Sequence, residues 1–233
     1  MKVINKIKNK FARRNSDTFI KYLRENGCKI GENTHFHDVK SVFIDVNRLN
    51  FIEIGKNCNI TMNVIILAHD YSYKVCRNVY GDMPQKSGVT KIGNNVFVGM
   101  NSIILMGAEI GNNVIVGAGS VVSGKIPDNC VVAGNPARVI CTLDKYHEKC
   151  VKNFEENAKI HAKRILETKK RNPTINEMLF YSLLFLKQDE EREMYLHNIN
   201  MTGDNKKEVI KDLMKIKNKY DGFDEFMESV REN

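Results

Sequence analysis

The segment KIGNNVFVGMNSIILMGAEIGNNVIVGAGSVV, from Lys91 to Val122, repeats itself every six residues. An aliphatic residue stands at each sixth position, at Ile92, Val98, Ile104, Ile110, Val116 and Val122. The residue after each aliphatic is mostly glycine, and a small or β-branched residue stands four positions after it. A helix repeats at about 3.6 residues and a strand at about 2, so neither alone explains this period. The period predicts a β-solenoid, in which each repeat buries its aliphatic residue by stacking on its neighbours.

The hexads also predict the shape of the solenoid. Three of them make a triangular turn of about 18 residues, and successive turns stack at roughly 4.8 Å, the spacing of paired strands. Glycine after the aliphatic residue tolerates the backbone angles of a corner, and the asparagine pairs at 94–95 and 112–113 suit turns. The alternative is an ordinary β-sandwich in which the spacing is a coincidence.

This run resembles the left-handed β-helix, hexapeptide-repeat acyltransferases, especially sugar O-acetyltransferases of the maltose and galactoside type and those of surface polysaccharides. The likeness continues through VVSGKIPDNCVVAGNPARVI, residues 121–140, which looks like the closing coil of that family. It covers roughly residues 30–140. The resemblance implies a mainly β fold built on a left-handed parallel β-helix, and acetyl-CoA as co-substrate with no metal.

The rest of the chain is predicted to be helical. We expect a helical cap at residues 1–27, the β-helix at 28–141 with a loop at 70–89, and an α-helical region at 142–233. Apolar residues recur at helical spacing in both flanking regions. The apolar run MLFYSLLFL at residues 178–186 is too short to span a membrane and is predicted to be a buried helix.

The first repeat block, upstream of the loop, has one break in its phase. Counting by six from Ile30 reaches Arg48, where an aliphatic residue is expected, before the pattern resumes at Ile54. We therefore expect a bulge or a slipped turn between Asp45 and Phe51. Between Ile66 and the next block the spacing is again not a multiple of six, which predicts the loop.

Charge and cysteine usage narrow the functional classes. Of the net charge of +8, residues 1–27 carry +6, from eight Lys and Arg against two acidic residues. This basic segment fits a helix that covers the open end of the solenoid, and is also compatible with peripheral contact with an anionic membrane. No basic patch with interleaved aromatics suggests nucleic acid. The six cysteines form no CxxC pair, and no signal peptide or spanning segment is visible, so we expect a cytoplasmic protein with free thiols.

His69 is the candidate catalytic residue, because it stands where the coil gives way to the loop. Acyl transfer from a thioester needs a base to take the proton of the acceptor hydroxyl, and an imidazole suits that work near neutral pH. In the family that the chain resembles, the catalytic histidine occupies this position. Asp70 is a second candidate, either orienting the ring or merely solvated. The alternative for His69 is a surface loop histidine.

The resemblance also implies the cofactor residues. Phe97 stands in the place of the family's tryptophan, and Met100 where serine is common, so only the backbone N–H of Met100 is expected to serve the oxyanion. The full set expected along the acetyl-CoA groove is Phe97, Gly99, Met100, Gly117, Ala118, Ser123, Lys125, Asn135, Pro136, Ala137 and Arg138. Ser123, Lys125 and Arg138 would meet the nucleotide phosphates; the alternative for Lys125 and Arg138 is ordinary surface charge.

The loop supplies the candidate acceptor site. Aromatic side chains and an Arg–Asn pair suit a sugar, which offers apolar faces and hydroxyl edges; the residues are Tyr71, Tyr73, Arg77, Asn78 and Tyr80. Because active sites in the resembling family form between subunits, a homotrimer is implied. Together these features predict transfer of acetyl to a hydroxyl of a sugar or surface-polysaccharide precursor.

Other functions remain open at this point. An N-acetyltransferase on an amino sugar nucleotide, on serine or on a xenobiotic would use the same solenoid. A hydratase similar to the γ-type carbonic anhydrases would need three histidines at one zinc, and only His35, His37 and His69 lie in the solenoid. A non-catalytic scaffold that recruits a partner through its helical tail is a third class.

Overall fold

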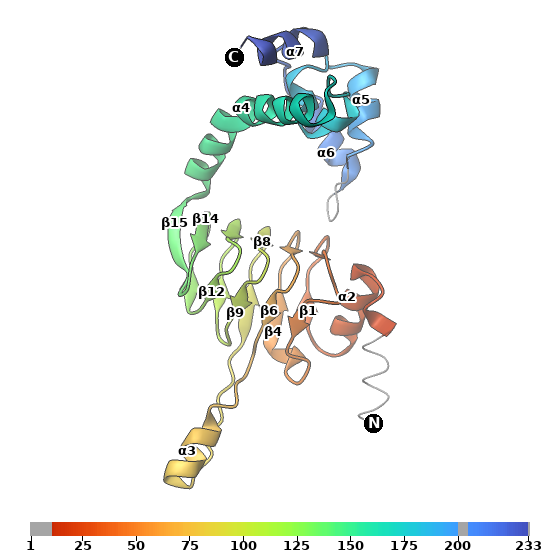
Figure 1. The fold of residues 1–233 in the computed structure, drawn as a ribbon. Coiled ribbons are helices and arrows are strands. Elements are labelled where there is room, and N and C mark those ends of the chain that lie inside the picture. Colours follow the sequence, from red (N-terminus) through yellow and green to blue (C-terminus); the bar gives the residue numbers. More distant parts are fainter. Residues whose placement is uncertain (1–10, 200–204, 233) are drawn as a thin grey trace. The chain divides into compact units, whose positions relative to one another are not determined.

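The computed structural model describes residues 11–199 and 205–232. The chain divides into two compact units, residues 1–146 and 147–233, and each is described by itself. The first unit is a three-sided parallel β-helix, which confirms the solenoid that the hexads predict (Figure 1). The basic residues 1–10, on which membrane contact was considered, lie outside the described residues.

Three parallel sheets, A, B and C, form the sides of the coil. Sheet A contains β1 (Lys29–Ile30), β4 (Ile52–Ile54), β7 (Thr90–Ile92), β10 (Glu109–Ile110) and β13 (Lys125–Ile126). Sheet B contains β2 (His35–Phe36), β5 (Asn59–Ile60), β8 (Val96–Val98), β11 (Val114–Val116), β14 (Cys130–Ala133) and the antiparallel β15 (Arg138–Thr142). Sheet C contains β3 (Phe43–Ile44), β6 (Ile65–Ile66), β9 (Ile103–Ile104) and β12 (Val121–Val122). Each strand is short because each side of the triangle holds only one hexad.

The aliphatic residue of each hexad fills the interior of the coil. Ile92, Val98 and Ile104, one from each sheet, are at most 3% exposed. The asparagines at the corners take left-handed backbone angles, as at Asn95 (φ 55°) and Asn113 (φ 56°), and their side chains bond to each other at 2.9 Å. Stacked corners of this kind hold successive turns in register.

The first turn of the coil is irregular, as its broken phase predicts. A 3₁₀ helix, η1 (Leu49–Phe51), interrupts it after β3, and Leu49 is buried while Arg48 is not. Counting by six from Ile30 also reaches Val42, which is buried at 2% exposed, but the strand of sheet C is Phe43–Ile44 and Ile44 faces inward as well. Strand pairing shows that the first turn is longer than the later ones. Lys29 pairs with Glu53, 24 positions further along the chain, whereas Lys91 pairs with Glu109, 18 positions further along.

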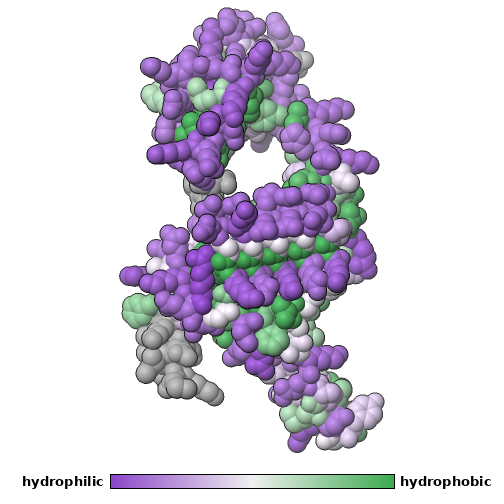
Figure 2. Space-filling model, turned by 180° about the vertical axis from the view of Figure 1, so that it is seen from behind, coloured by the Kyte–Doolittle hydropathy of each residue, from purple (hydrophilic) through white to green (hydrophobic). Residues whose placement is uncertain are grey.

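The outer face of sheet A is a shallow groove with charged edges. Figure 2 shows its floor as a hydrophobic stripe bordered by hydrophilic rows. The groove is lined by isoleucines of the sheet, among them Ile92 and Ile110, and by the glycines that follow them. One border alternates in charge, and its ion pairs join Lys29 to Glu53 at 2.7 Å and Lys125 to Glu109 at 3.4 Å.

Helices flank the coil. In the first unit, α2 (Ser16–Glu25) packs on β1 and β2 and buries Phe19 and Leu23 completely, at the first turn of the coil. The predicted loop contains a helix of its own, α3 (Tyr73–Tyr80), at the end of an arm that projects from the coil (Figure 1). The long α4 (Leu143–Lys169) begins directly after β15.

The second unit is helical around a core of its own. Besides most of α4 it contains η2 (Asn176–Leu184), α5 (Glu190–Leu196), α6 (Lys206–Leu213) and α7 (Phe223–Arg231). The apolar run predicted as a buried helix forms η2, in which Met178 is buried but Phe180 is 69% exposed. Arg192 is fully buried and donates from Nε to the carbonyl of Leu186 at 2.9 Å. Within the described ranges, no helix combines the length and the apolar character needed to cross a membrane.

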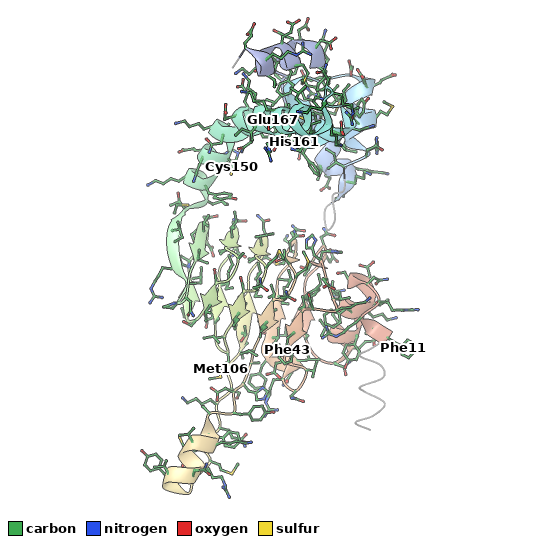
Figure 3. The ribbon with its side chains drawn as sticks, viewed as in Figure 1. Phe11, Phe43, Met106, Cys150, His161 and Glu167 are labelled. Atoms are coloured by element: carbon green, nitrogen blue, oxygen red, sulfur yellow. The ribbon has the colours of Figure 1, made fainter. Side chains whose placement is uncertain are left out.

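The cysteines differ sharply in accessibility, which predicts their reactivity. Burial raises the pKa of the Cys28 thiol to about 12 and also raises the pKa of Cys58, so both stay protonated at pH 8. Cys150 on α4 is exposed (Figure 3). We expect Ellman's reagent to label Cys150 in the native protein and to label Cys28 and Cys58 only after unfolding. Peptide mass mapping checks this, a Cys150→Ser variant being the control; equal labelling of Cys28 in the native protein would contradict the buried assignment.

Candidate active site

His69 lies where the coil opens into the arm. It follows β6 in sheet C, and its backbone forms an antiparallel bridge with Ser87, on the returning side of the arm. The amide of Gly88 donates to the carbonyl of Ala68 at 3.0 Å, so the arm leaves and rejoins the coil at one place. The side chain of His69 is 16% exposed, which leaves it partly open to solvent.

The residue that orients His69 is Asp45, which the sequence did not indicate. Asp45 follows β3, and its carboxylate Oδ2 is in contact with Nδ1 of His69. The carboxylate is itself fixed, because Oδ1 accepts from the amide of Asn47 at 3.2 Å and Oδ2 from that of Ala68 at 3.3 Å. An ionised carboxylate only accepts hydrogen bonds, so Nδ1 carries the proton and Nε2 keeps its lone pair. This tautomer is the one that a general base requires.

Asp70, the orienting residue considered from the sequence, has a different role. Its Oδ1 accepts from the amide of Ser72 at 2.9 Å and from the Ser72 hydroxyl at 2.6 Å. These bonds lower the pKa of Asp70, and they tie its side chain to the start of the arm. Of the two alternatives for Asp70, orienting the ring or remaining solvated, the contacts favour the second, because Nδ1 of His69 is in contact with Asp45 and not with Asp70.

A polar pocket of about 410 Å³ surrounds His69. It is lined by Asn47, Arg48, His69, Asp70, Tyr71, Tyr73, Gln85, Lys86 and Ser87. The rings of His69 and Tyr71 meet edge to face, with centroids 5.0 Å apart, and Tyr73 follows at 6.2 Å from Tyr71. Two of the five predicted acceptor residues thus lie beside the histidine, and the pocket has the size of a small-ligand site.

The other three predicted acceptor residues do not line this pocket. Arg77, Asn78 and Tyr80 lie on α3, in which no side chain is buried. Tyr80 is 77% exposed, and Arg77 donates to the Asn78 side chain at 3.4 Å. The sequence could not separate these residues from Tyr71 and Tyr73, because the helix that carries them away was not expected.

The predicted cofactor residues begin on a different side of the coil. Phe97 projects from the outer face of sheet B and is 43% exposed, in register with Ile115 of the next turn. Met100 and Ala118 are also exposed, close to the end of that sheet. Gly99 has a structural reason for its identity: a Cβ there would lie 2.6 Å from the amide of Ala118. This glycine is required by the close stacking of the turns.

The remaining cofactor residues lie near the end of the coil. Ser123 follows β12 and is exposed, and Lys125 lies on sheet A, where Glu109 pairs with it. Ala137 is buried and donates to the carbonyl of Val121 at 2.8 Å, while Arg138 is exposed. The neighbouring Asn135–Pro136 peptide is cis. The eleven predicted residues are therefore spread over all three sides and the closing loop, and do not form one cluster with His69 in a single chain.

Comparison with known proteins adds relatives to this geometry. The profile of the bacterial transferase hexapeptide (six repeats) family matches residues 90–124. Protein CapG of Staphylococcus aureus is 39% identical over 140 residues, which are 60% of this chain and 80% of CapG. YvoF of Bacillus subtilis, provisionally named an acetyltransferase, is 34% identical over 54% of this chain and 67% of YvoF.

Two further proteins are similar over part of their length. WbbJ of Escherichia coli, provisionally named a lipopolysaccharide biosynthesis O-acetyl transferase, is 37% identical over 42% of this chain and 54% of WbbJ. The crystal structure of a maltose O-acetyltransferase from Clostridium difficile aligns over 60% of this chain and 83% of that chain, with 29% identity and a TM-score of 0.43.

No group of three or more His, Cys, Asp or Glu side chains that could hold a metal ion occurs among residues 11–199 and 205–232. His35 and His37 lie together at the start of sheet B, with ring centroids 5.0 Å apart. The parallel β-helix, the hexads, and the identity to CapG over most of its length lead to one conclusion: the chain belongs to the hexapeptide-repeat acyltransferase family.

Proposed function

We propose that this enzyme transfers an acetyl group from acetyl-CoA to a hydroxyl of a sugar or surface-polysaccharide precursor, with His69 as the general base. The observation that carries the proposal is the contact between His69 and the buried Asp45 at the mouth of a polar pocket. The relation to WbbJ supports a hydroxyl acceptor of this class, since that protein is named for O-acetyl transfer in lipopolysaccharide biosynthesis.

The proposed mechanism is direct transfer within a ternary complex. Nε2 of His69 takes the proton of the acceptor hydroxyl as its oxygen attacks the thioester carbonyl. A tetrahedral intermediate forms, and its negative oxygen is stabilised by backbone N–H groups, among them that of Met100. The C–S bond then breaks, and the proton held by His69 passes to the departing thiolate. Asp45 stabilises the imidazolium while it exists.

The residues proposed for acetyl-CoA fit an extended, partly apolar ligand. Phe97 and Ile115 form an apolar strip on the outer face of sheet B, and the exposed Ala118 leaves room beside it. Arg138 and Ser123, both exposed, are proposed to meet the phosphates, with the 134–137 loop at the adenine. Lys125 is a weaker candidate, because Glu109 already pairs with it.

A homotrimer with sites between subunits is part of the proposal. His69 and Phe97 belong to different sides of one chain, so a second copy is needed to put a cofactor strip beside His69. We further propose that the coil is left-handed, as the resemblance implies. A cytoplasmic location is supported by the six free cysteines.

An apolar column on the outer face of sheet C is the surface through which we propose that copies of the chain contact one another in the trimer. The column consists of Phe43, Ile65, Ile103 and Val121, which are paired in register along the sheet. Phe43 is 52% exposed, and Figure 3 shows it on the outside of the coil. We expect Phe43→Glu to weaken association at least about tenfold, because a carboxylate buried in an apolar contact loses hydration.

Light scattering of the purified protein measures this change as a loss of trimer mass on dilution. Phe180→Glu is the matched control, since Phe180 is 69% exposed but lies in the second unit. A trimer that is unchanged by Phe43→Glu would show that the apolar column is not the contact between copies.

The function itself is tested by thiol release from acetyl-CoA with a panel of acceptors. The panel contains neutral sugars, amino sugars and serine, and the acetylated product is treated with hydroxylamine, which cleaves esters but leaves amides. We expect release that depends on a sugar and a product that hydroxylamine cleaves. A stable amide product would assign N-transfer, and acetyl-CoA that is bound but never consumed would favour a scaffold.

A further inference from the structure

The irregular first turn of the coil places a cation in the pocket of His69. At Arg48 the six-residue count expects an aliphatic residue, but Leu49 is the side chain buried in the core at this turn. Arg48 is displaced outward and lines the pocket, half-buried. The irregular turn therefore places a cation in the pocket, and the β-helix fold by itself does not require a cation there.

The same turn also positions the carboxylate behind His69. The amide of Arg48 donates to the carbonyl of Asp45 at 3.1 Å, and the amide of Asn47 donates to Oδ1 of Asp45 at 3.2 Å. A single tight turn thus fixes the orienting carboxylate and the backbone from which the Arg48 side chain extends. A group bound by Arg48 therefore lies in the same pocket as the imidazole.

A second cation reaches the pocket from the arm. Lys86 precedes Ser87, whose backbone is bridged to His69, so the returning side of the arm brings Lys86 to the edge of the pocket. It lies near enough to Asp70 to contribute to the lowering of that pKa. Two cations from separate segments therefore face one histidine.

The hydrogen-bonding capacity left in the pocket favours an anion. Asp45 is already engaged, by His69 and by backbone amides, and Oδ1 of Asp70 accepts from Ser72. In the part of the chain that the structure describes, neither cation is in an ion pair, and the Arg48 guanidinium bonds only to the carbonyl of Asn47, at 3.1 Å. Arginine and lysine donors of this kind bind carboxylates and phosphates through charge-assisted hydrogen bonds.

We infer that the acceptor carries a carboxylate or phosphate, which Arg48 and Lys86 bind while a neighbouring hydroxyl is presented to His69. This inference rests on the proposed function and names the class of its acceptor. It makes Arg48 and Lys86 specificity-determining residues. They select the acceptor and take no part in the transfer step. An acidic sugar or a sugar phosphate fits this chemistry, and a neutral sugar leaves the cations without a partner.

The test compares three matched acceptors: methyl glucoside, glucuronate and glucose 1-phosphate. Thiol release from acetyl-CoA is expected to give kcat/KM at least about tenfold higher for the better anionic acceptor than for methyl glucoside. Arg48→Gln and Lys86→Gln should each lower that ratio by about tenfold, through the KM for the acceptor. Lys56→Gln, an exposed lysine outside the pocket, is the matched control and should keep the ratio. Whichever anionic acceptor is preferred identifies carboxylate or phosphate.

Two results would overturn the inference. One is an unchanged acceptor ratio in both variants while transfer continues. The other is a rise in the KM for acetyl-CoA alone, which would mean that the cations bind the phosphates of the cofactor. If no acceptor is turned over, the proposed function has failed, and inorganic phosphate then tests the site directly. A phosphate-dependent shift of the His69 imidazole resonance that Arg48→Gln abolishes supports the anion site, and no shift in the wild type rejects it.

Discussion

His69→Ala is expected to lower kcat for acetyl transfer by about 10²–10⁴-fold, while the KM for acetyl-CoA stays close to the wild-type value. The base acts on the proton that moves in the transition state, so its removal does not weaken the binding of the thioester in the ground state. The ring is only partly buried, with 16% of the side chain exposed, so the substitution leaves the core of the coil intact. Thiol release at saturating acetyl-CoA measures the effect.

The control for this experiment is His147→Ala, a histidine on the exposed first part of α4. It should keep wild-type turnover. Equal turnover by the His69→Ala enzyme, with circular dichroism showing an unchanged fold, would remove His69 from the mechanism.

Asp45→Asn is expected to lower kcat by about 10²-fold or more, although Asp45 touches no substrate in the proposed mechanism. The amide has the size of the carboxylate but carries no charge to stabilise the imidazolium, and its NH₂ group can hold the ring in the wrong tautomer. A structural role alone would not shift the pH profile. The loss of the carboxylate should instead move the acidic limb of kcat/KM to lower pH, because the protonated imidazole becomes less stable without it and the pKa of the ring falls.

Asp70→Asn is the matched comparison, since both variants exchange one carboxylate for an amide beside His69. The Asp70 side chain bonds to Ser72 and not to the ring, so we expect a loss several-fold smaller than that of Asp45→Asn. Equal losses in the two variants would contradict the assignment of Asp45 as the orienting residue. Asp45→Ala is less informative, because it also leaves buried amides without an acceptor.

The fold could be predicted because its signal is local and repeated. Each hexad places one aliphatic residue inside and one glycine or asparagine at a corner, so Ile92, Val98 and Ile104 specify three sides of one turn. The same logic located His69, the proposed base, at the point where the repeat stops, while its proposed role came also from the resemblance to the acyltransferase family.

The partner of His69 could not be found in this way. Asp45 lies 24 residues earlier in the chain, and only the length of the irregular first turn brings it beneath the ring. That length depends on η1. The one sign of η1 in the sequence is Arg48, which precedes it and stands where the six-residue count expects an aliphatic residue. The place of Arg48 in the pocket was missed for the same reason: a break in a pattern shows where the chain deviates, but not where the side chain then lies.

The α3 helix was missed because its stability does not come from a core. No side chain in Tyr73–Tyr80 is buried, and the helix ends at Gly81 in a left-handed conformation (φ 82°). Its polar sequence suited a loop equally well, so three of the predicted acceptor residues were assigned to a pocket that they do not line.

The arm is attached to the coil at a single place, so the residues of the arm can change while the stacked turns of the coil stay the same. Residues 70–86 form the arm beyond the bridge between His69 and Ser87, and β6 and β7 keep their stacking on either side of it. An arm of another length or composition could be exchanged there at little entropic cost, since loop closure depends only weakly on length. Lineages could therefore acquire new acceptors by replacing one insert, while the repeats beneath it drift slowly under the demands of stacking.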